Sequence, residues 1–209
     1  MKSKRGVFIS FEGIDGSGKS TQILHLKSML EGKGFSVIFV REPGGTLVSE
    51  RIRPILLDKG SAGMKPEAEL LLFEAARAQI VREVIEPALF RGEIVICDRF
   101  FDSTVAYQGY ARGIDLDTIH KLNDFATGGL EPDITFLLDL PVEDAVKRQG
   151  KRGEKDRMEL EGVAFMQKVR DGFLTHASSK DRMVVLDARN EEMVLAQTIE
   201  NKFWEVVDI

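Results

Sequence analysis

Cysteine is almost absent from this sequence of 209 residues, because Cys97 is the only one. A single cysteine excludes a disulfide within the chain and provides no thiolate cluster for zinc. Cys97 ends an apolar run, which favours a buried and inert thiol. The three histidines, His25, His120 and His176, match no metal-binding or triad spacing. We interpret them as surface or structural residues.

Long apolar runs and an excess of positive charge are also missing. The apolar run at residues 7–11 is shorter than the ~7–15 residues of a signal-peptide core. No stretch approaches the ~18 apolar residues of a membrane span. The net charge of -5 argues against a nucleic-acid polymer as partner, because such binding needs a basic face. We expect a cytoplasmic protein with no membrane segment, whose charge is still compatible with small nucleotides.

The composition is that of an ordinary globular domain, with 43% apolar and 30% charged residues. A chain of 209 residues is long for one average domain and short for two. We therefore expect a single domain over residues 1–209.

A glycine-rich stretch at residues 13–21 follows the first apolar run and precedes a helix-like stretch. Its spacing, a glycine, four variable residues and then Gly-Lys-Ser, is that of a phosphate-binding loop. Glycines permit the tight turn that points consecutive N–H groups at a phosphate. Lys19 would reach the outer phosphates, and the Ser20 hydroxyl would ligate Mg²⁺. The alternative is a glycine-rich turn with a solvated lysine, while a dinucleotide fingerprint would need a glycine at Thr21.

Five apolar runs, at residues 7–11, 37–40, 94–97, 135–140 and 183–186, alternate with helical patterns. This alternation predicts an α/β fold with a five-stranded parallel sheet and helices on both faces. The longest helical pattern spans residues 66–85, and Pro87 is expected to end it. The carboxyl ends of parallel strands meet at one edge of the sheet, so the features that follow the strands should face one crevice.

Two such features carry charge. Asp98 and Arg99 follow the third strand, where a carboxylate can hold Mg²⁺ through water and an arginine can bind a phosphate. Residues 147–161 are rich in both signs of charge. This segment is either a solvated helix face or a lid whose arginines close over phosphates.

Beyond the phosphate loop the chain holds a second cationic and aromatic set, made of Arg53, Phe73, Arg77, Arg99 and Gln108. This set indicates a second substrate of nucleotide size. No Asn-Lys-x-Asp motif for guanine and no Leu-Ser-Gly-Gly-Gln transporter signature occurs. A GTPase switch and a transporter ATPase are therefore disfavoured.

Five segments in order, FEGIDGSGKST, REPGGT, LLFEAARAQ, DRFFDSTVAYQGYARG and DRMELE, span nearly the whole chain. At these segments the sequence resembles the thymidylate kinases, which transfer the γ-phosphoryl group of ATP to dTMP and give dTDP and ADP for dTTP synthesis. The resemblance implies a three-layer sandwich of the P-loop nucleoside triphosphate hydrolase type, Mg²⁺ with ATP as co-substrate, and a homodimer.

The resemblance also implies the acceptor site. Arg53 and Arg99 would hold the dTMP phosphate, and Asp15 the 3′-hydroxyl. Phe73 would stack on thymine, and Tyr107 would crowd the 2′ position of the sugar. The residues that would read or border the base edge are Arg77, Thr104 and Gln108.

The ATP-binding residues implied are Gly13, Ile14, Asp15, Gly16, Ser17, Gly18, Lys19, Ser20 and Thr21. Some family members carry a catalytic arginine in this loop, whereas this chain has Gly16 and Ser17 there. The resemblance therefore assigns the catalytic charge to the lid at about residues 147–161, with Arg148 and Arg152 as candidates and Arg157 as a further one. Lys19, Arg99 and Asp15 complete the catalytic set.

Two other functions are compatible with the motifs. A deoxynucleoside kinase would act on an uncharged nucleoside and would need a general base for its 5′-hydroxyl. The two arginines placed for a phosphate favour a monophosphate acceptor instead. A non-catalytic regulator would bind ATP without turnover.

The lid assignment yields a first prediction. Arg152→Ala should lower kcat by a factor on the order of 10³, because an arginine that stabilises the transition state is worth about that much. The KM for dTMP should change far less. Steady-state kinetics measures both, and an equal loss in both would indicate substrate binding instead.

Overall fold

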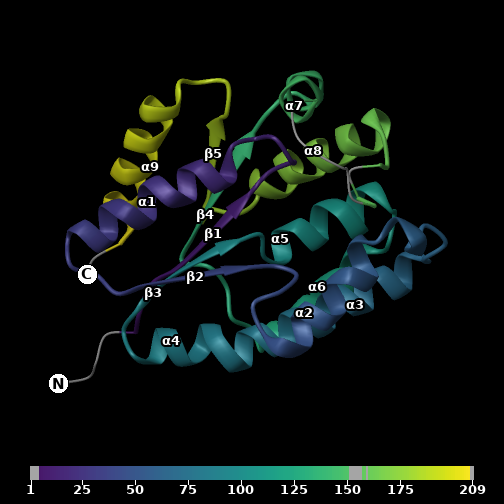
Figure 1. Ribbon diagram of the computed structural model, residues 1–209, viewed down its shortest axis with the longest axis horizontal. Helices are drawn as coiled ribbons and strands as arrows, with labels where there is room; N and C mark the ends of the chain where they lie inside the picture. Colours follow the sequence, from purple (N-terminus) through teal and green to yellow (C-terminus); the bar gives the residue numbers. More distant parts are fainter. Residues whose placement is uncertain (1–4, 151–156, 159, 208–209) are drawn as a thin grey trace.

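The computed structural model describes residues 5–150, 157–158 and 160–207 (Figure 1). Its centre is a sheet of five parallel strands in the order β2-β3-β1-β4-β5. The strands are β1 (Phe8–Glu12), β2 (Val37–Arg41), β3 (Ile94–Asp98), β4 (Ile134–Asp139) and β5 (Met183–Asp187). The predicted α/β class and the five-stranded parallel sheet are confirmed.

Helices cover both faces of the sheet, as expected for parallel strands. One face carries α1 (Lys19–Gly32) and α9 (Glu192–Val206). The other carries α3 (Pro66–Ile80), η2 (Val81–Ile85), α4 (Glu86–Phe90), α5 (Phe101–Thr104) and α8 (Val163–Ala177). The remaining helical segments are α2 (Leu47–Leu57), η1 (Lys59–Ser61), η3 (Val105–Ala111), α6 (Leu116–Thr127) and α7 (Val142–Gln149).

Alternation along the central strands divides the core into two layers. In β1, Phe8 packs with Val95 and Cys97, while Ile9 and Phe11 face the layer under α1. Neighbouring side chains of a strand point to opposite faces, so a strand covered on both sides is mostly apolar, and the buried Ser10 and Glu12 of β1 are hydrogen-bonded exceptions. Cys97 is fully buried, which confirms the interpretation drawn from its apolar run.

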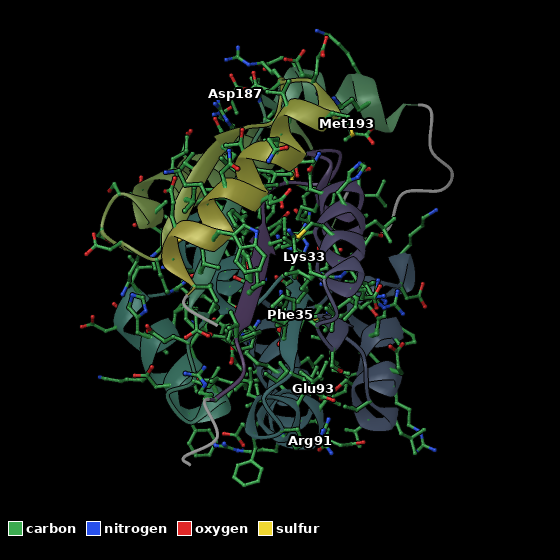
Figure 2. The ribbon with its side chains drawn as sticks, turned by 90° about the vertical axis from the view of Figure 1, so that its left-hand side faces the viewer. Lys33, Phe35, Arg91, Glu93, Asp187 and Met193 are labelled. Carbon is green, nitrogen blue, oxygen red and sulfur yellow. The ribbon has the colours of Figure 1, made fainter. Side chains whose placement is uncertain are left out.

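The first and last helices lie side by side (Figure 2). Lys33, at the end of α1, places its Nζ 5.6 Å from the centre of the Trp204 ring and 3.8 Å from Glu200. The ring of Phe35 lies 6.0 Å from that of Trp204. The carboxyl-terminal helix is thereby fixed on the helix that follows the phosphate loop.

The prediction that Pro87 ends the long helix is wrong. The chain stays helical from Pro66 to Phe90, because the π-helical segment η2 leads directly into α4. Pro87 is the second residue of α4. It follows directly on the π-helical turn, in which Glu86 N–H donates to the carbonyl oxygen of Val81, and this i→i−5 pattern replaces the i→i−4 ladder that a proline would break.

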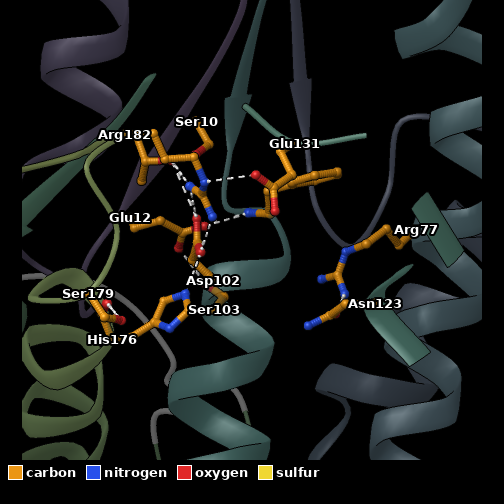
Figure 3. A network of polar contacts seen from close by, with 12 residues as sticks. Ser10, Glu12, Arg77, Asp102, Ser103, Asn123, Glu131, His176, Ser179 and Arg182 are labelled. Carbon is orange, nitrogen blue, oxygen red and sulfur yellow. Dashed lines mark hydrogen bonds and ion pairs between the residues drawn. The ribbon is translucent and has the colours of Figure 1, made fainter. Parts of the chain in front are cut away.

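A buried carboxylate joins three elements on the α8 face of the sheet (Figure 3). Asp102 of α5 accepts two hydrogen bonds from Arg182, at 2.7 and 2.8 Å, and lies 2.9 Å from His176 of α8. Arg182 also donates to Thr135 of β4 at 2.7 Å. Burial acts to raise the pKa of Asp102, but the hydrogen bonds from His176 and Arg182 outweigh it and lower the pKa to about 2. His176 is thus the structural histidine that we expected.

A second prediction follows from this carboxylate. Asp102→Asn should lower the free energy of unfolding at pH 7 by about 3 kcal/mol, because it leaves the largely buried Arg182 with only the exposed Glu131, 3.8 Å away, as counter-charge. A lowered pKa stabilises the fold above the unfolded value of 3.8, and that stability is lost as pH falls towards 2. The variant should therefore lose this part of the acid sensitivity, which urea unfolding between pH 2 and pH 7 measures.

Asp187→Asn provides the matched control. The hydrogen bonds from Arg189 also lower the pKa of Asp187 to about 2. The two side chains are, however, 43% and 62% exposed, so water and salt screen the pair. A loss of stability as large as that of Asp102→Asn would contradict our account of burial.

Candidate active site

A cavity of about 260 Å³ opens at the carboxyl edge of the sheet, beside the phosphate loop. Residues from six segments line it: Asp15, Gly16, Gly18, Lys19, Ser20, Thr21, Arg41, Glu42, Pro43, Arg53, Leu57, Phe73, Arg77, Asp98, Arg99, Phe100, Ser103, Thr104, Tyr107, Gln108 and Met158. All of the predicted acceptor residues are among them. The expectation that the features after the strands face one crevice is confirmed for the loop, for residues 41–43 and for Asp98.

The phosphate loop turns on glycines in the left-handed region. Gly13, Gly16 and Gly18 have φ angles of 131°, 87° and 95°. A Cβ atom on Gly13 would lie 2.5 Å from the carbonyl oxygen of Leu138, so no larger residue fits. The loop is therefore packed directly against the end of β4.

Lys19 is the first residue of α1, and its side chain folds back into the loop. Its Nζ donates to the carbonyl oxygens of Gly13 and Ile14, at 3.0 and 3.3 Å. Burial lowers the pKa of the ammonium group, and the nearby Arg99 lowers it further. Gly13 and Ile14 thus contact the lysine through their carbonyl groups and are not among the residues that line the cavity. Ser17 lines a second cavity behind the loop.

Asp98 and Ser20 offer oxygen donors to a cation. Asp98 Oδ1 is buried and has no hydrogen-bond partner among the described residues. The Ser20 side chain is exposed and lines the same cavity. A carboxylate and a hydroxyl are ligands that Mg²⁺ takes in nucleotide sites. Within the described ranges, no group of three or more His, Cys, Asp or Glu side chains could hold a metal by protein ligands alone.

Arg99 joins the two sides of the cavity. Its Nη2 donates to Asp15 Oδ1 of the phosphate loop at 2.7 Å. The guanidinium carbon lies 5.4 Å from the centre of the Tyr107 ring. Asp15, Arg99 and Tyr107, which were predicted separately, therefore form one cluster.

Arg77 lies at the floor of the cavity, with 2% of its surface exposed. It donates to Glu42 at 2.9 Å, Glu74 at 2.6 Å, Thr104 at 2.9 Å and Asn123 at 3.1 Å. Burial raises the pKa of Glu42 to about 7, although Arg77 acts to lower it. The surrounding carboxylates and amide hold the guanidinium in one place.

The three partners Glu42, Glu74 and Asn123 were missed in the sequence. The sequence did hold a signal for two of them. Glu42 lies in the turn-rich segment after β2, and Glu74 lies three residues before Arg77 on a helix, where side chains are neighbours. Asn123 had none, since it comes from α6, far along the chain.

Glu69 is a further missed residue and is almost fully buried. It accepts a hydrogen bond from Gln108 Nε2 at 2.8 Å and pairs with Arg112 at 3.0 Å and Arg157 at 2.6 Å. Gln108 consequently has its amide nitrogen turned towards Glu69. Arg157 also donates to the carbonyl oxygen of Leu56 at 2.7 Å, so this lid candidate is held inside the protein.

The remaining predicted residues fall in different places. Phe73 is half-buried on the cavity wall, and Arg53 Nη1 donates to the carbonyl oxygen of Pro43 at 2.6 Å. Arg148 lines the second cavity and donates to the carbonyl oxygen of Ala188 at 3.0 Å. Arg152 lies outside the described residues.

The parallel sheet, the phosphate loop after its central strand and the adjoining cavity together define a P-loop nucleotide-binding protein. Comparisons with known proteins agree with this class. Residues 11–199 match the family model described as thymidylate kinase. The chain therefore belongs to the thymidylate kinase family, whose general activity is ATP-dependent conversion of dTMP to dTDP.

Individual relatives support the assignment. The thymidylate kinase of Geotalea daltonii is 53% identical over 190 residues, covering 87% of this chain and 89% of its own length. That of Desulforudis audaxviator is 49% identical, covering 93% of this chain and 88% of its own length. A crystal structure of thymidylate kinase from Ehrlichia chaffeensis is similar with a TM-score of 0.79 and 36% identity, over 95% of this chain and 99% of that one.

The position of Lys19 gives a third prediction. Lys19→Ala should abolish turnover, because it removes the ammonium group that the loop holds at the cavity wall, where phosphates would bind. The urea unfolding midpoint should stay close to that of the unaltered protein, since the lysine serves phosphates more than the core. Lys27→Ala, on the same helix but paired with Glu31 at the surface, is the control and should keep its turnover. Loss of cooperative unfolding in Lys19→Ala would refute this division of roles.

Proposed function

We propose that this chain transfers the γ-phosphoryl group of ATP to dTMP, with the residues of the cavity in the roles given below. The observation that carries the proposal is that one cavity holds both the loop lysine, Lys19, and the acceptor set around Arg99. The Arg99–Asp15 contact at 2.7 Å links the two halves. A single transfer site needs this proximity, because the acceptor oxygen must lie close to the γ-phosphorus and in line with it.

On the acceptor side, Arg53 and Arg99 hold the dTMP phosphate, and Asp15 receives the 3′-hydroxyl. Phe73 stacks on the thymine ring from the cavity wall. Tyr107, which is almost fully buried beside Arg99, crowds the 2′ position of the sugar and so favours the deoxy form.

The thymine edge is read by Arg77, Thr104 and Gln108. Gln108 Nε2–H donates a hydrogen bond to Glu69, which leaves the Gln108 carbonyl oxygen as an acceptor for the base. Arg77 is fixed by its buried partners and offers a donor edge that cannot swing away. Discrimination among bases then rests on groups whose orientation is set before the nucleotide binds.

On the donor side, the loop at residues 13–21 holds the ATP phosphates. The N–H groups come from its residues on the cavity wall, residues 15, 16 and 18–21, and Lys19 neutralises the outer charge. Ser20 and Asp98, the latter through water, are the residues that would hold Mg²⁺. Their oxygen donors fit this ion, and Asp98 Oδ1 has no hydrogen-bond partner within the described part of the chain. The ion, when bound, screens the charge between the phosphates.

The reaction requires alignment and charge more than proton transfer. A phosphate monoester has a second pKa near about 6, so the acceptor is mostly dianionic at neutral pH and needs no general base. Arg99 screens the acceptor, and Arg148 and Arg152 supply positive charge to the transferring group. Closure of the lid excludes water, which would otherwise accept the phosphoryl group.

We further propose a cytoplasmic homodimer. The support from the structure is a set of exposed apolar side chains on α2, α3 and α6, namely Leu47, Val48, Ile55, Leu71 and Phe125. Exposed apolar area of this kind marks association surfaces. None of the helices in the described parts of the chain is long and apolar enough to cross a membrane.

An ADP-release assay provides the fourth prediction. With ATP and Mg²⁺, the purified protein should release ADP fastest with dTMP, and more slowly with dUMP, dCMP, AMP or thymidine. Faster turnover of thymidine would replace the proposal with a nucleoside kinase. Binding of ATP without turnover of any acceptor would indicate a regulator.

A further inference from the structure

Arg99 stands out in the backbone geometry of the described chain. Its φ angle of 69° is the only positive φ found at a described residue other than glycine. The left-handed region is unfavourable for a side chain with a Cβ atom, so neighbouring contacts must hold the turn in place. The question is which contacts do so.

The carboxylate of Glu12 spans this turn. Its Oε1 accepts a hydrogen bond from the backbone N–H of Phe100 at 2.7 Å, and its Oε2 accepts one from Ser103 Oγ at 2.6 Å. Ser103 Oγ in turn accepts a hydrogen bond from Arg99 Nη1 at 3.2 Å. Glu12 therefore contacts both the backbone after Arg99 and, through Ser103, the guanidinium itself (Figure 3 shows Glu12 beside Ser103).

Glu12 has no exposed surface and does not line the cavity. It is the last residue of β1, directly before the phosphate loop, and β1 pairs with β3, which ends at Asp98. The backbone of the same turn is also tied to β1, because Arg99 N donates to the carbonyl oxygen of Phe11 at 3.0 Å. The carboxylate is thus buried between the two strands that carry the donor and acceptor halves of the site.

We infer that Glu12 is a positioning residue, which holds the left-handed turn at Arg99 and so aims the guanidinium at the acceptor phosphate. The inference rests on the proposed role of Arg99. Two short hydrogen bonds to one buried carboxylate fix the Phe100 backbone and the Ser103 hydroxyl. With these fixed, Arg99 meets Asp15 and the cavity in one orientation.

Glu12→Gln tests this inference. The substitution keeps the volume and one acceptor oxygen, but its NH₂ group cannot accept the Ser103 hydrogen bond. We expect the KM for dTMP to rise about tenfold or more, since small displacements of a positioning group are costly. The KM for ATP should change by less than about twofold, because ground-state donor contacts are kept. Calorimetric binding of dTMP without ATP should weaken by the same factor as the KM for dTMP rises.

Asp133→Asn is the matched control. Asp133 accepts a hydrogen bond from the backbone N–H of Phe8 at 2.7 Å, at the opposite end of the same strand. Its side chain is exposed, unlike that of Glu12, but it also accepts a backbone hydrogen bond and does so on β1 without touching the Arg99 turn. If both variants raise the KM for dTMP equally, Glu12 serves the strand and the inference fails.

A double-mutant comparison tests whether Glu12 affects dTMP binding through Arg99 or independently of it. In an Arg99→Ala background, Glu12→Gln should add less than about a twofold change in dTMP affinity, because coupled residues are not additive. Full additivity would overturn the inference. Should Glu12→Gln fail to fold, Ser103→Ala removes one of the two hydrogen bonds and should still raise the KM for dTMP above that of Asp133→Asn.

Failure of the proposed function would look different. The unaltered protein would then show no ADP release with dTMP. The positioning role could still be tested in that case, by measuring the affinity for inorganic phosphate calorimetrically in Glu12→Gln and in the unaltered protein. Equal affinities would contradict the positioning role.

Discussion

The geometry of the site depends on a hydrogen bond between two neighbouring strand ends, from the backbone of Phe100 to the carboxylate of Glu12. Parallel pairing of β1 with β3 brings those ends to the same edge of the sheet. The hydrogen bond from Arg99 N to the carbonyl oxygen of Phe11 ends this ladder, and pairing leaves the direction of the chain after Arg99 undetermined. The buried carboxylate determines it, and the phosphate loop on one strand then faces the arginine on the other.

Buried charge is compensated locally throughout the cavity walls. Arg77 is matched by Glu42 and Glu74, and Glu69 is matched by Arg112 and Arg157. Each pair loses hydration on folding, and removing one partner would leave the other buried without compensation. Such pairs contribute little net stability, but they fix the orientation of the groups at the cavity. A rigid wall of this kind suits a ligand whose base must be distinguished by a few hydrogen bonds.

Much of this arrangement could be predicted from the sequence, because the strands and the phosphate loop each have a signature within a few consecutive residues. Continuous apolar runs gave the sheet, and the spacing around Lys19 gave the loop. That the phosphate loop and Asp98 face one crevice followed from the rule that parallel strands end at one edge, whereas the contact between Asp15 and Arg99 was not predicted. The partners Glu12, Glu69 and Asn123 could not be predicted, because their contacts join segments far apart in the chain. The prediction from Pro87 failed for a different reason, since a π-helical segment before it lets the helix continue through the proline.

The strand order has a consequence for how the chain assembles during synthesis. β1 is made first, yet it occupies the middle of the sheet between β3 and β4. Its hydrogen-bond partners, which end at Asp98 and Asp139, leave the ribosome much later. The glycine loop beside it packs against Leu138 and cannot take its final form before that residue is available. Contacts between residues this distant in sequence slow folding, and the apolar strands stay exposed until their partners are made. The amino-terminal half of the nascent chain should therefore need chaperones to prevent aggregation during synthesis, even if the finished fold is stable.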